Sequence, residues 1–495
     1  MPIGYTMAMN NRPVHDVSHT PSPPSDAPSI ASDSATRQIG LQWLDSRFLG
    51  WLGLSLLLIG IVVYVRFGMR AGVDFDDYYY PAGMRYLHGQ SPYVLHGDPL
   101  QIAAAARGEI PPIVLTWYGG SPTTCALFAP FALLPHDAAK FVWLLCCVGA
   151  FSASMWLALS ELLPSWSRSQ RLLLLGVTAC AGSLRWNGGQ AQIEPLVVAG
   201  YGLVLYGEMR RKTGMILAGG WLTFLKLNAF PPLFCLLLLR GRYRLLAGIL
   251  ILVVAIDLLA AARLGVRATY AGNFLALINY AAPGTNNYPD AHAILQWIHN
   301  EPRPMVVSPG LVPNSSFNAA GADFLHWAFL ISAFTGSMSA ANLLGALCSL
   351  AALCLLGVLA WRTGRQRCSD EFTLRFFGAS VCLGLLCISH LKYDVLMLIF
   401  PFFIALGRKP ARPETLLSLT VCFLLAYAIP GGILMAWWLR HIVVPTNGVA
   451  LVPLYSYLVT LAFAAALVSV WRYTNDGDTP SVDPTSSSSS TQVGS

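Results

Sequence analysis

The chain has 495 residues, of which 55% are hydrophobic and only 11% are charged, about half the charged fraction of an ordinary soluble domain. Apolar runs of membrane length recur from Phe48 to Trp471, so the composition excludes a string of soluble domains and favours a polytopic membrane protein. The net charge of +7 is modest and falls mainly in short loops between apolar runs, so we predict no nucleic-acid partner.

The two ends of the chain differ in composition from the rest. Residues 1–46 are rich in Pro, Ser, Asp and His without periodicity, and residues 474–495 contain a serine run. Neither segment can bury enough apolar area to offset the entropy lost on ordering. We therefore predict a disordered cytoplasmic tail at 1–46, a transmembrane domain at 47–473 and a disordered Ser-rich tail at 474–495.

The apolar runs give an all-α polytopic membrane protein. The candidate spans are 48–66, 122–136, 138–160, 171–186, 191–207, 214–226, 229–239, 245–263, 341–361, 374–389, 393–407, 415–438 and 449–471. Thirteen spans cannot leave both termini on one side, and 122–136 and 171–186 are shorter than the roughly 20 residues that a perpendicular span needs. The prediction is about twelve spans with both ends in the cytoplasm.

Orientation follows from four basic loops, because Lys and Arg beside membrane spans are retained on the cytoplasmic side. These loops contain Arg210-Arg211-Lys212, Arg240/Arg242/Arg244, Arg362/Arg365/Arg367 and Arg408/Lys409/Arg412. The long loops 67–121 and 264–340 then lie outside, and 321–337 becomes an interfacial helix. Segment 214–239, between two inner loops, is expected to be a short hairpin with its tip at Lys226-Leu227-Asn228.

The first outer loop opens with Asp74-Phe75-Asp76-Asp77-Tyr78-Tyr79-Tyr80. The plainest interpretation is that the acids cap and solvate an amphipathic interfacial helix at 76–88. That interpretation is favoured for Asp76 and Asp77. Asp74 lies at the end of the first span, where a lipid headgroup is presented, and a carboxylate there can act as a general base.

Three further polar clusters interrupt the apolar runs. Arg185-Trp186-Asn187-Gly188-Gly189-Gln190-Ala191-Gln192, with Glu194 following, is either a polar network between helices or part of a cavity, and the two alternatives are balanced. Lys226 lies about twelve residues from either basic loop, so it is a candidate phosphate ligand, with snorkelling as the alternative. Ser389-His390-Leu391-Lys392-Tyr393-Asp394 is an anion or sugar site, or a solvated turn.

Ten of the eleven cysteines fall inside apolar runs, and no paired-Cys or Cys/His metal spacing occurs. We therefore predict neither a disulfide framework nor zinc. Asp74-Phe75-Asp76 has the Asp-x-Asp pattern that can bind a metal, but successive acids also occur as helix caps, so no metal and no cofactor is predicted.

At these residues the chain resembles glycosyltransferase family 87, membrane transferases with the GT-C fold typified by polyprenyl-phosphate-mannose-dependent α-1,2-mannosyltransferases. The resemblance is carried by Asp74-Phe75-x-x-Tyr78-Tyr79-x-x-Ala82-Gly83, Leu87-x-Gly89-x-x-Pro92-Tyr93, Leu127-Phe128-Ala129-Pro130-Phe131-Ala132-Leu133-Leu134-Pro135, Gly189-Gln190, Lys226 after Ala218-Gly219-Gly220, and His390 with Tyr393-Asp394. It covers roughly residues 70–445 in order. The chain departs from the family where Tyr118-Gly119-Gly120-Ser121-Pro122 replaces Tyr-Pro-Pro and Lys226-Leu227-Asn228 replaces Lys-Pro.

The resemblance implies a hexosyltransferase that moves a sugar, mannose first among the candidates, from a polyprenyl-phosphate donor to a glycolipid or glycan acceptor, with inversion, on the periplasmic or extracellular side of a bacterial inner (plasma) membrane. It makes Asp74 the general base and gives Lys226 and His390 to the donor phosphate. Substrate contacts are expected from the following residues: Tyr78, Tyr79, Asn187, Gln190, Tyr393 and Asp394.

Two other classes of function remain as alternatives. A lipid or glycolipid transporter explains the apolar bulk and Lys226, but it does not explain the acidic tyrosine run or the order of the motifs. The lack of visible internal repeats also weighs mildly against a transporter. A scaffolding subunit without activity predicts that Asp74→Asn leaves the glycan profile of the cell unchanged.

Overall fold

The computed structural model describes residues 46–72, 74–93, 95–96, 116–117, 120–281, 324–325, 327, 331, 338–363, 369–387, 390–407, 412–428 and 454–475. Nearly all of the two predicted tails, most of the predicted interfacial helix at 321–337 and much of both long outer loops lie outside these residues.

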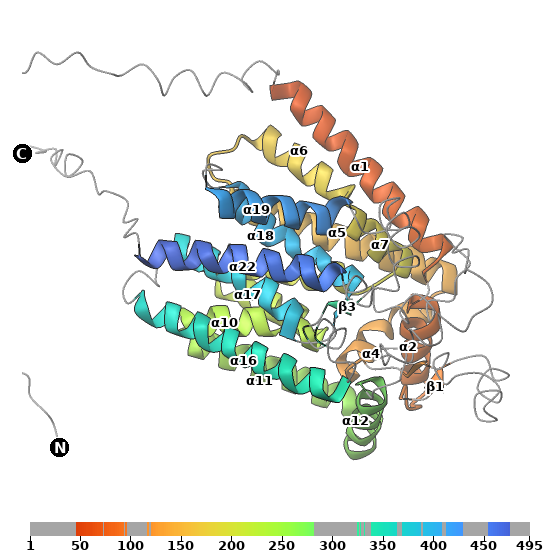
Figure 1. The fold of residues 1–495 in the computed structure, drawn as a ribbon. Coiled ribbons are helices and arrows are strands. Elements are labelled where there is room, and N and C mark those ends of the chain that lie inside the picture. Colours follow the sequence, from red (N-terminus) through yellow and green to blue (C-terminus); the bar gives the residue numbers. More distant parts are fainter. Residues whose placement is uncertain are drawn as a thin grey trace, which may run out of the picture. The chain divides into compact units, whose positions relative to one another are not determined.

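The described part of the chain is built from helices. They are α1 (Ser46–Arg70), α2 (Tyr80–Leu87), α4 (Pro122–Phe128), α5 (His136–Leu162), α6 (Arg168–Ala179), α7 (Gly182–Gln190), α8 (Glu194–Arg210), α9 (Thr213–Phe224), α10 (Pro231–Leu239), α11 (Tyr243–Ala262), α12 (Val266–Ala281), α16 (Met338–Arg362), α17 (Asp370–Cys387), α18 (Ile399–Leu406), α19 (Pro413–Phe423) and α22 (Leu454–Asn475). Figure 1 shows most of the long helices side by side, with α2, α4 and α12 gathered at one end.

Short elements complete the described chain. They are the π-helices η1 (Phe75–Tyr79) and η7 (Leu424–Ala428), and the 3-10 helices η3 (Phe131–Leu133), η4 (Leu227–Ala229) and η6 (Lys392–Leu398). Strand β1 (Leu95–His96) pairs antiparallel with β2 (Thr116–Trp117), and β3 (Phe324–Leu325) pairs antiparallel with β4 (His390–Leu391). Within the residues that the structure describes, the predicted all-α class is therefore confirmed, apart from these two-residue ladders.

Five stretches are long and apolar enough to cross a bilayer: Arg47–Arg70, His136–Leu162, Tyr243–Ala262, Leu343–Arg362 and Leu458–Asn475. The remaining apolar helices in the described residues are shorter. These stretches indicate an integral membrane protein, whereas the total of about twelve spans stays a prediction.

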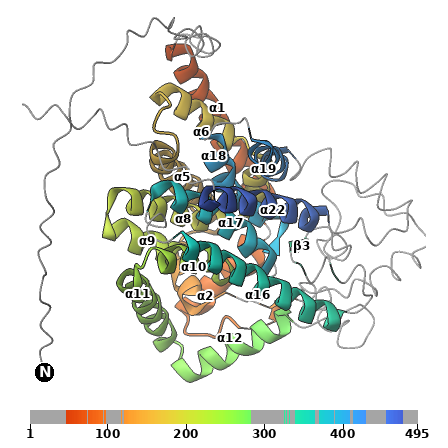
Figure 2. The same cartoon turned by 60° about the vertical axis from the view of Figure 1, so that its left-hand side comes forward.

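Helix α1 packs closely on α6, and the two run beside each other in both views (Figures 1 and 2). A methyl group added at Gly53 would come within 2.5 Å of the Leu173 backbone nitrogen, so the helix backbones nearly touch there. Gly60 faces Ala179 in the same way, with the Ala179 carbonyl 2.6 Å from such a methyl group. Small residues at this seam permit the backbone contact that membrane helices use for association.

The core joins α8 to the later helices through aromatic side chains. The ring of Tyr201, which is fully buried, lies edge-to-face against Phe377 at 5.6 Å and Phe400 at 5.8 Å. Its hydroxyl donates a hydrogen bond to the carbonyl oxygen of Ala229 in η4. This contact fixes the segment that follows Lys226 against the centre of the bundle.

Three predicted elements take a more specific form in the structure. The hairpin predicted at 214–239 is present as α9, η4 and α10, and Lys226 has extended φ and ψ angles of −127° and 100° at the break. The predicted span 171–186 is wrong as one helix, because the chain leaves α6 after Ala179 and starts α7 at Gly182. The helix predicted at 76–88 begins instead as the π-helix η1 and continues as α2.

Candidate functional site

Asp74 lies four residues beyond the end of α1, at the start of η1. Next to it, Phe75 is fully buried and packs against Tyr80 and Phe128, with ring centroids 5.7 and 6.1 Å away. Asp74 has helical angles of −72° and −28°, and its side chain makes no capping hydrogen bond. The capping interpretation of this carboxylate is therefore wrong. Single π turns inside helices often occur at functional sites.

The electrostatic environment of Asp74 is unusual for an aspartate outside the membrane-spanning helices. Its side chain is partly accessible, yet the surrounding protein removes enough water that burial raises the pKa from 3.8 to about 7. The positive charge of Lys226 opposes this increase, and the negative charge of Asp77 adds to it. A carboxyl group with a pKa near neutrality suits general acid–base chemistry.

The two neighbouring acids, Asp76 and Asp77, differ from Asp74 in their surroundings. Asp76 forms an ion pair with Lys140 of α5 at 2.8 Å, and His136 lies 3.0 Å from its other oxygen. The Lys140 side chain is only 4% exposed, so Asp76 compensates a buried charge rather than merely facing solvent. The Asp77 side chain is exposed, but the protein beside it still excludes part of the solvent, and this desolvation together with the negative charge of Asp76 raises its pKa. Asp76 therefore differs from the solvating helix residue favoured from the sequence, and the choice of Asp74 over its two neighbours as the base stays a prediction.

Two of the tyrosines pack in different places. The Tyr79 ring stacks on Phe128 with a centroid distance of 4.6 Å, and its hydroxyl donates to Oε1 of Gln192 at 3.1 Å. Tyr78 packs against the small cluster of Ala82, Tyr93 and Cys125, whereas Tyr79 packs against both this cluster and the main core. This hydrogen bond to Gln192 joins the acidic tyrosine segment, residues 74–80, to the polar residues before α8.

The segment 185–194 supplies residues from a buried turn. Asn187 is fully buried, and its Nδ2 donates to the Ser183 carbonyl one helical turn earlier. Gln190, half-buried, ends α7, and Ala191 follows in the left-handed conformation with φ of 52°. The Ala191 carbonyl accepts a hydrogen bond from the Trp143 indole at 2.9 Å. The turn thus brings Gln192 and Glu194 to the start of α8.

Lys226 is the centre of a buried charge cluster. Its ammonium group donates to Oε2 of Glu194 at 3.0 Å and to Oδ1 of Asp394. The exposed fractions are 18% for the lysine side chain, 0% for Glu194 and 1% for Asp394. Two carboxylates that lie 32 and 168 residues from Lys226 in the chain therefore meet at its ammonium group, and that group also acts electrostatically on Asp74.

The segment around His390 approaches the same cluster. The backbone of His390 pairs with Leu325 in the β3–β4 ladder, and η6 then carries the buried Asp394 to Lys226. The side chains of His390, Lys392 and Tyr393 lie outside the described residues. The structure thus joins Asp74, Lys226 and Asp394 electrostatically, while the predicted role of His390 stays a prediction.

Sequence reasoning missed the two partners that complete this arrangement. Gln192 and Glu194 were visible as polar residues in a largely apolar stretch, but nothing in the sequence paired them with Tyr79 and Lys226. Lys140 had a similar signal, a cation near the start of an apolar run. Within the described ranges, no group of three His, Cys, Asp or Glu residues is arranged to hold a metal ion.

Chemically, the arrangement places a carboxyl group with a pKa near 7 within electrostatic range of a buried cation, at one end of the helical bundle. Comparison with known proteins adds one finding. The family model for glycosyltransferase family 87 matches residues 118–389, more than half of the chain. Neither a curated protein nor a solved structure is similar enough to count as a match.

Proposed function

The chain belongs to glycosyltransferase family 87, and from this premise we propose that it transfers a sugar, with mannose the first candidate, from a polyprenyl-phosphate donor to a hydroxyl of a glycolipid or glycan. Membership of the family makes the chain a glycosyltransferase. The donor, the acceptor, the residue roles and the membrane side are our proposal.

Asp74 is the proposed general base, and its environment is the observation that carries the proposal. A carboxylate with the ordinary pKa of 3.8 is a weak base at neutral pH, whereas one near 7 accepts a proton readily and is still ionised in about half of the molecules at pH 7. Because the Asp74 side chain makes no helix-capping hydrogen bond, its carboxylate is not committed to stabilising the start of η1.

The proposed reaction is a single displacement at the anomeric carbon. The acceptor hydroxyl oxygen forms a bond to that carbon while the bond from the carbon to the phosphate oxygen breaks. The hydroxyl proton passes to the Asp74 carboxylate, and the electron pair of the broken bond leaves with polyprenyl phosphate. Because the acceptor attacks from the face opposite the leaving group, the anomeric configuration inverts.

Lys226 and His390 are proposed to compensate the charge of the leaving phosphate. The ammonium group of Lys226 is held by two buried carboxylates, so it is positioned before substrate arrives. A prepositioned cation stabilises a developing negative charge without reorganisation during the reaction. Asp394 acts in this proposal by orienting Lys226.

The remaining predicted contacts are proposed for the sugar and the acceptor. Tyr79 and Gln190 are half-buried, in η1 and at the end of α7, and Tyr78 and Tyr393 are proposed as further substrate contacts. Asn187 is buried and bonded within α7, which favours a role in shaping the turn.

The proposed setting is a GT-C-type bundle of about twelve spans in a bacterial inner membrane, with Asp74 on the periplasmic or extracellular side. The five membrane-length helices and the hairpin at Lys226 support this setting. Irregular backbone at membrane depth occurs where it lines a cavity or is surrounded by protein, as it is beside Lys226.

The test is Asp74→Asn in reconstituted protein supplied with labelled polyprenyl-phosphate mannose and a lipid extract containing acceptors. We expect near-complete loss of transfer with no loss of thermal stability, because the neutral amide replaces a carboxyl group whose pKa is raised by burial. Asp77→Asn is the matched control, since it removes an exposed acid three residues away and should retain turnover. Full activity of Asp74→Asn, or loss only in Asp77→Asn, would assign the base to another residue.

The role of Lys226 needs a test that separates catalysis from folding. Lys226→Met leaves Glu194 and Asp394 as buried carboxylates without their cation, a change that costs about 3–5 kcal/mol of stability. The double variant Lys226→Met/Glu194→Gln should recover part of that stability but not transfer. Recovery of transfer together with stability would show that the cation serves folding alone.

A further inference from the structure

A cavity of about 410 Å³ lies away from Asp74, between the end of α5 and the start of α6. Trp156 and Ser160 of α5 and Arg168 and Arg171 of α6 line it. The volume falls within the range of small-molecule sites. No part of the proposed reaction uses these four residues.

The cavity is separated from Asp74 by most of the length of α5. That helix begins at His136, whose ring contacts Asp76, and it reaches the cavity 20 to 24 residues later. At 1.5 Å per residue the separation is roughly 30–36 Å, about the thickness of the hydrocarbon core of a bilayer. The cavity therefore lies at the opposite membrane interface from the proposed catalytic site.

The cavity carries positive charge that the described residues do not neutralise. Neither Arg168 nor Arg171 forms an ion pair with another described residue, and Nε of Arg171 is buried without a hydrogen-bond partner there. The adjacent acid, Glu161, is already bound, because it accepts from Ser160 at 3.0 Å and pairs with Arg210 at 2.8 Å. Two guanidinium groups thus remain for an anion.

One of the two arginines, Arg171, is held in place before any ligand binds. The guanidinium of Arg171 lies 6.0 Å from the centre of the Trp156 ring, within range of a cation–π contact. The first turn of α6 is fixed by a capping box in which Ser167 and Gln170 bond each other's backbone amides. The positive end of the helix dipole adds to the attraction for an anion.

From these observations we propose that the cavity binds a phosphate group, and that the ligand is the headgroup of an anionic membrane lipid. Paired arginines match the geometry of phosphate oxygens, basic pockets between membrane helices bind anionic headgroups, and Trp156 belongs to the residue type enriched at the interface. The basic residue Arg210 lies at the same end, so under the predicted orientation the pocket faces the cytoplasmic leaflet. The site is independent of the sugar-transfer chemistry.

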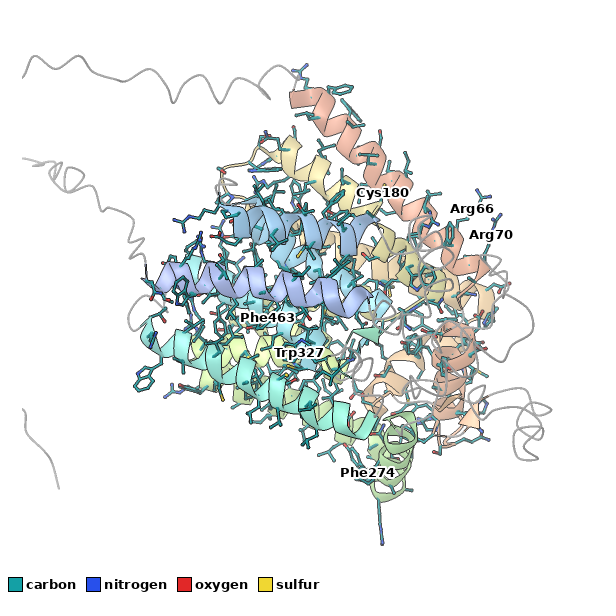
Figure 3. The ribbon with its side chains drawn as sticks, in the orientation of Figure 1. Arg66, Arg70, Cys180, Phe274, Trp327 and Phe463 are labelled. Atoms are coloured by element: carbon teal, nitrogen blue, oxygen red, sulfur yellow. The ribbon has the colours of Figure 1, made fainter. Side chains whose placement is uncertain are left out.

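The test uses the full-length protein in detergent, titrated with phosphatidylglycerol or phosphatidylcholine and followed by native mass spectrometry. We expect wild type to prefer phosphatidylglycerol, and each Arg→Gln change to weaken that binding roughly fivefold, so that Arg168→Gln/Arg171→Gln loses about 25-fold. The matched control is Arg66→Gln/Arg267→Gln, which removes two exposed arginines elsewhere; Arg66 lies at the far end of α1 (Figure 3). Sugar transfer should persist in both double variants.

A second arm adds inorganic phosphate at millimolar concentration. Loss of lipid binding in the cavity variant alone, with no displacement by free phosphate, supports the lipid headgroup. Phosphate binding to wild type but not to the cavity variant also supports the site, with a soluble ligand. If Arg168→Gln/Arg171→Gln binds both ligands as the control does, the proposal is overturned. If that variant fails to fold, the single variant Arg168→Gln, at an exposed position, is tested instead. It should bind phosphatidylglycerol about fivefold more weakly than wild type, and unchanged binding would overturn the proposal.

Discussion

The pH dependence of sugar transfer gives the sharpest check on Asp74. A general base works only when deprotonated, and with a pKa of about 7 the ionised fraction is about three quarters at pH 7.5 and about 3% at pH 5.5. We therefore expect kcat/KM to fall about 25-fold over these two pH units. A base with the ordinary carboxyl pKa of 3.8 would lose almost nothing over the same range.

A neighbouring substitution tests the direction of this effect. The charge of Asp77 raises the pKa of Asp74, so Asp77→Asn should move the acid limb of the profile to lower pH. The shift should be less than about one unit, because Asp77 is exposed and its charge is screened by solvent. Asp137→Asn, at a side chain that is 88% exposed, removes an acid elsewhere in the outer region and should leave the limb in place.

The assay is the initial rate of transfer from labelled polyprenyl-phosphate mannose in proteoliposomes between pH 5.5 and 8, at donor concentrations below KM. Donor integrity is measured in protein-free vesicles at each pH, because glycosyl phosphates hydrolyse in acid. A rate that stays flat down to pH 5.5 in wild type, or an acid limb that moves upward in Asp77→Asn, refutes the reasoning.

Three further changes probe stability. The folded-state pKa of Asp74 exceeds the unfolded value, so wild type loses stability as pH rises from about 4 to 7. Asp74→Asn lacks this ionisation and should therefore be more stable than wild type. Thermal unfolding should show that the difference grows by about 2–3 kcal/mol between pH 5 and 7.5. Lys140→Met removes the buried partner of Asp76 and should cost less than the roughly 3–5 kcal/mol of a fully buried pair, because the aspartate is one-third exposed. Gly53→Leu forces α1 from α6 and should cost about 1–3 kcal/mol or more, whereas Gly149→Ala, with open space around it, should be neutral or stabilising. An equal loss in both glycine variants would contradict the close-packed seam.

The sequence was a good guide wherever local pattern decides structure. The hairpin at Lys226 followed from two apolar pieces too short to span and flanked by basic loops. The candidate span 122–136 is shorter than a perpendicular span needs, and this stretch forms the short elements α4 and η3. Both features depend on length and hydropathy, which a single sequence displays directly.

Features that depend on distant partners could not be predicted. Nothing local states that Lys226 meets Asp394, because these residues are 168 positions apart and no pattern links them. The end of α6 at Ala179 could not be predicted for a related reason. Hydropathy averages across 171–186 and does not register that α6 ends where α1 packs against it.

The position of the cation decides whether Asp74 can act as a base. Burial alone would leave the carboxyl protonated near neutral pH, and a closer cation would lower its pKa until it became a weak base. Glu194 and Asp394 hold the ammonium group between them and so fix its distance from Asp74. Glu194→Gln removes one negative charge from this cluster and leaves more of the positive charge of Lys226 to act on Asp74. The acid limb should then move to lower pH, in the same direction as in Asp77→Asn, and an unmoved limb would mean that the cluster does not set the strength of the base.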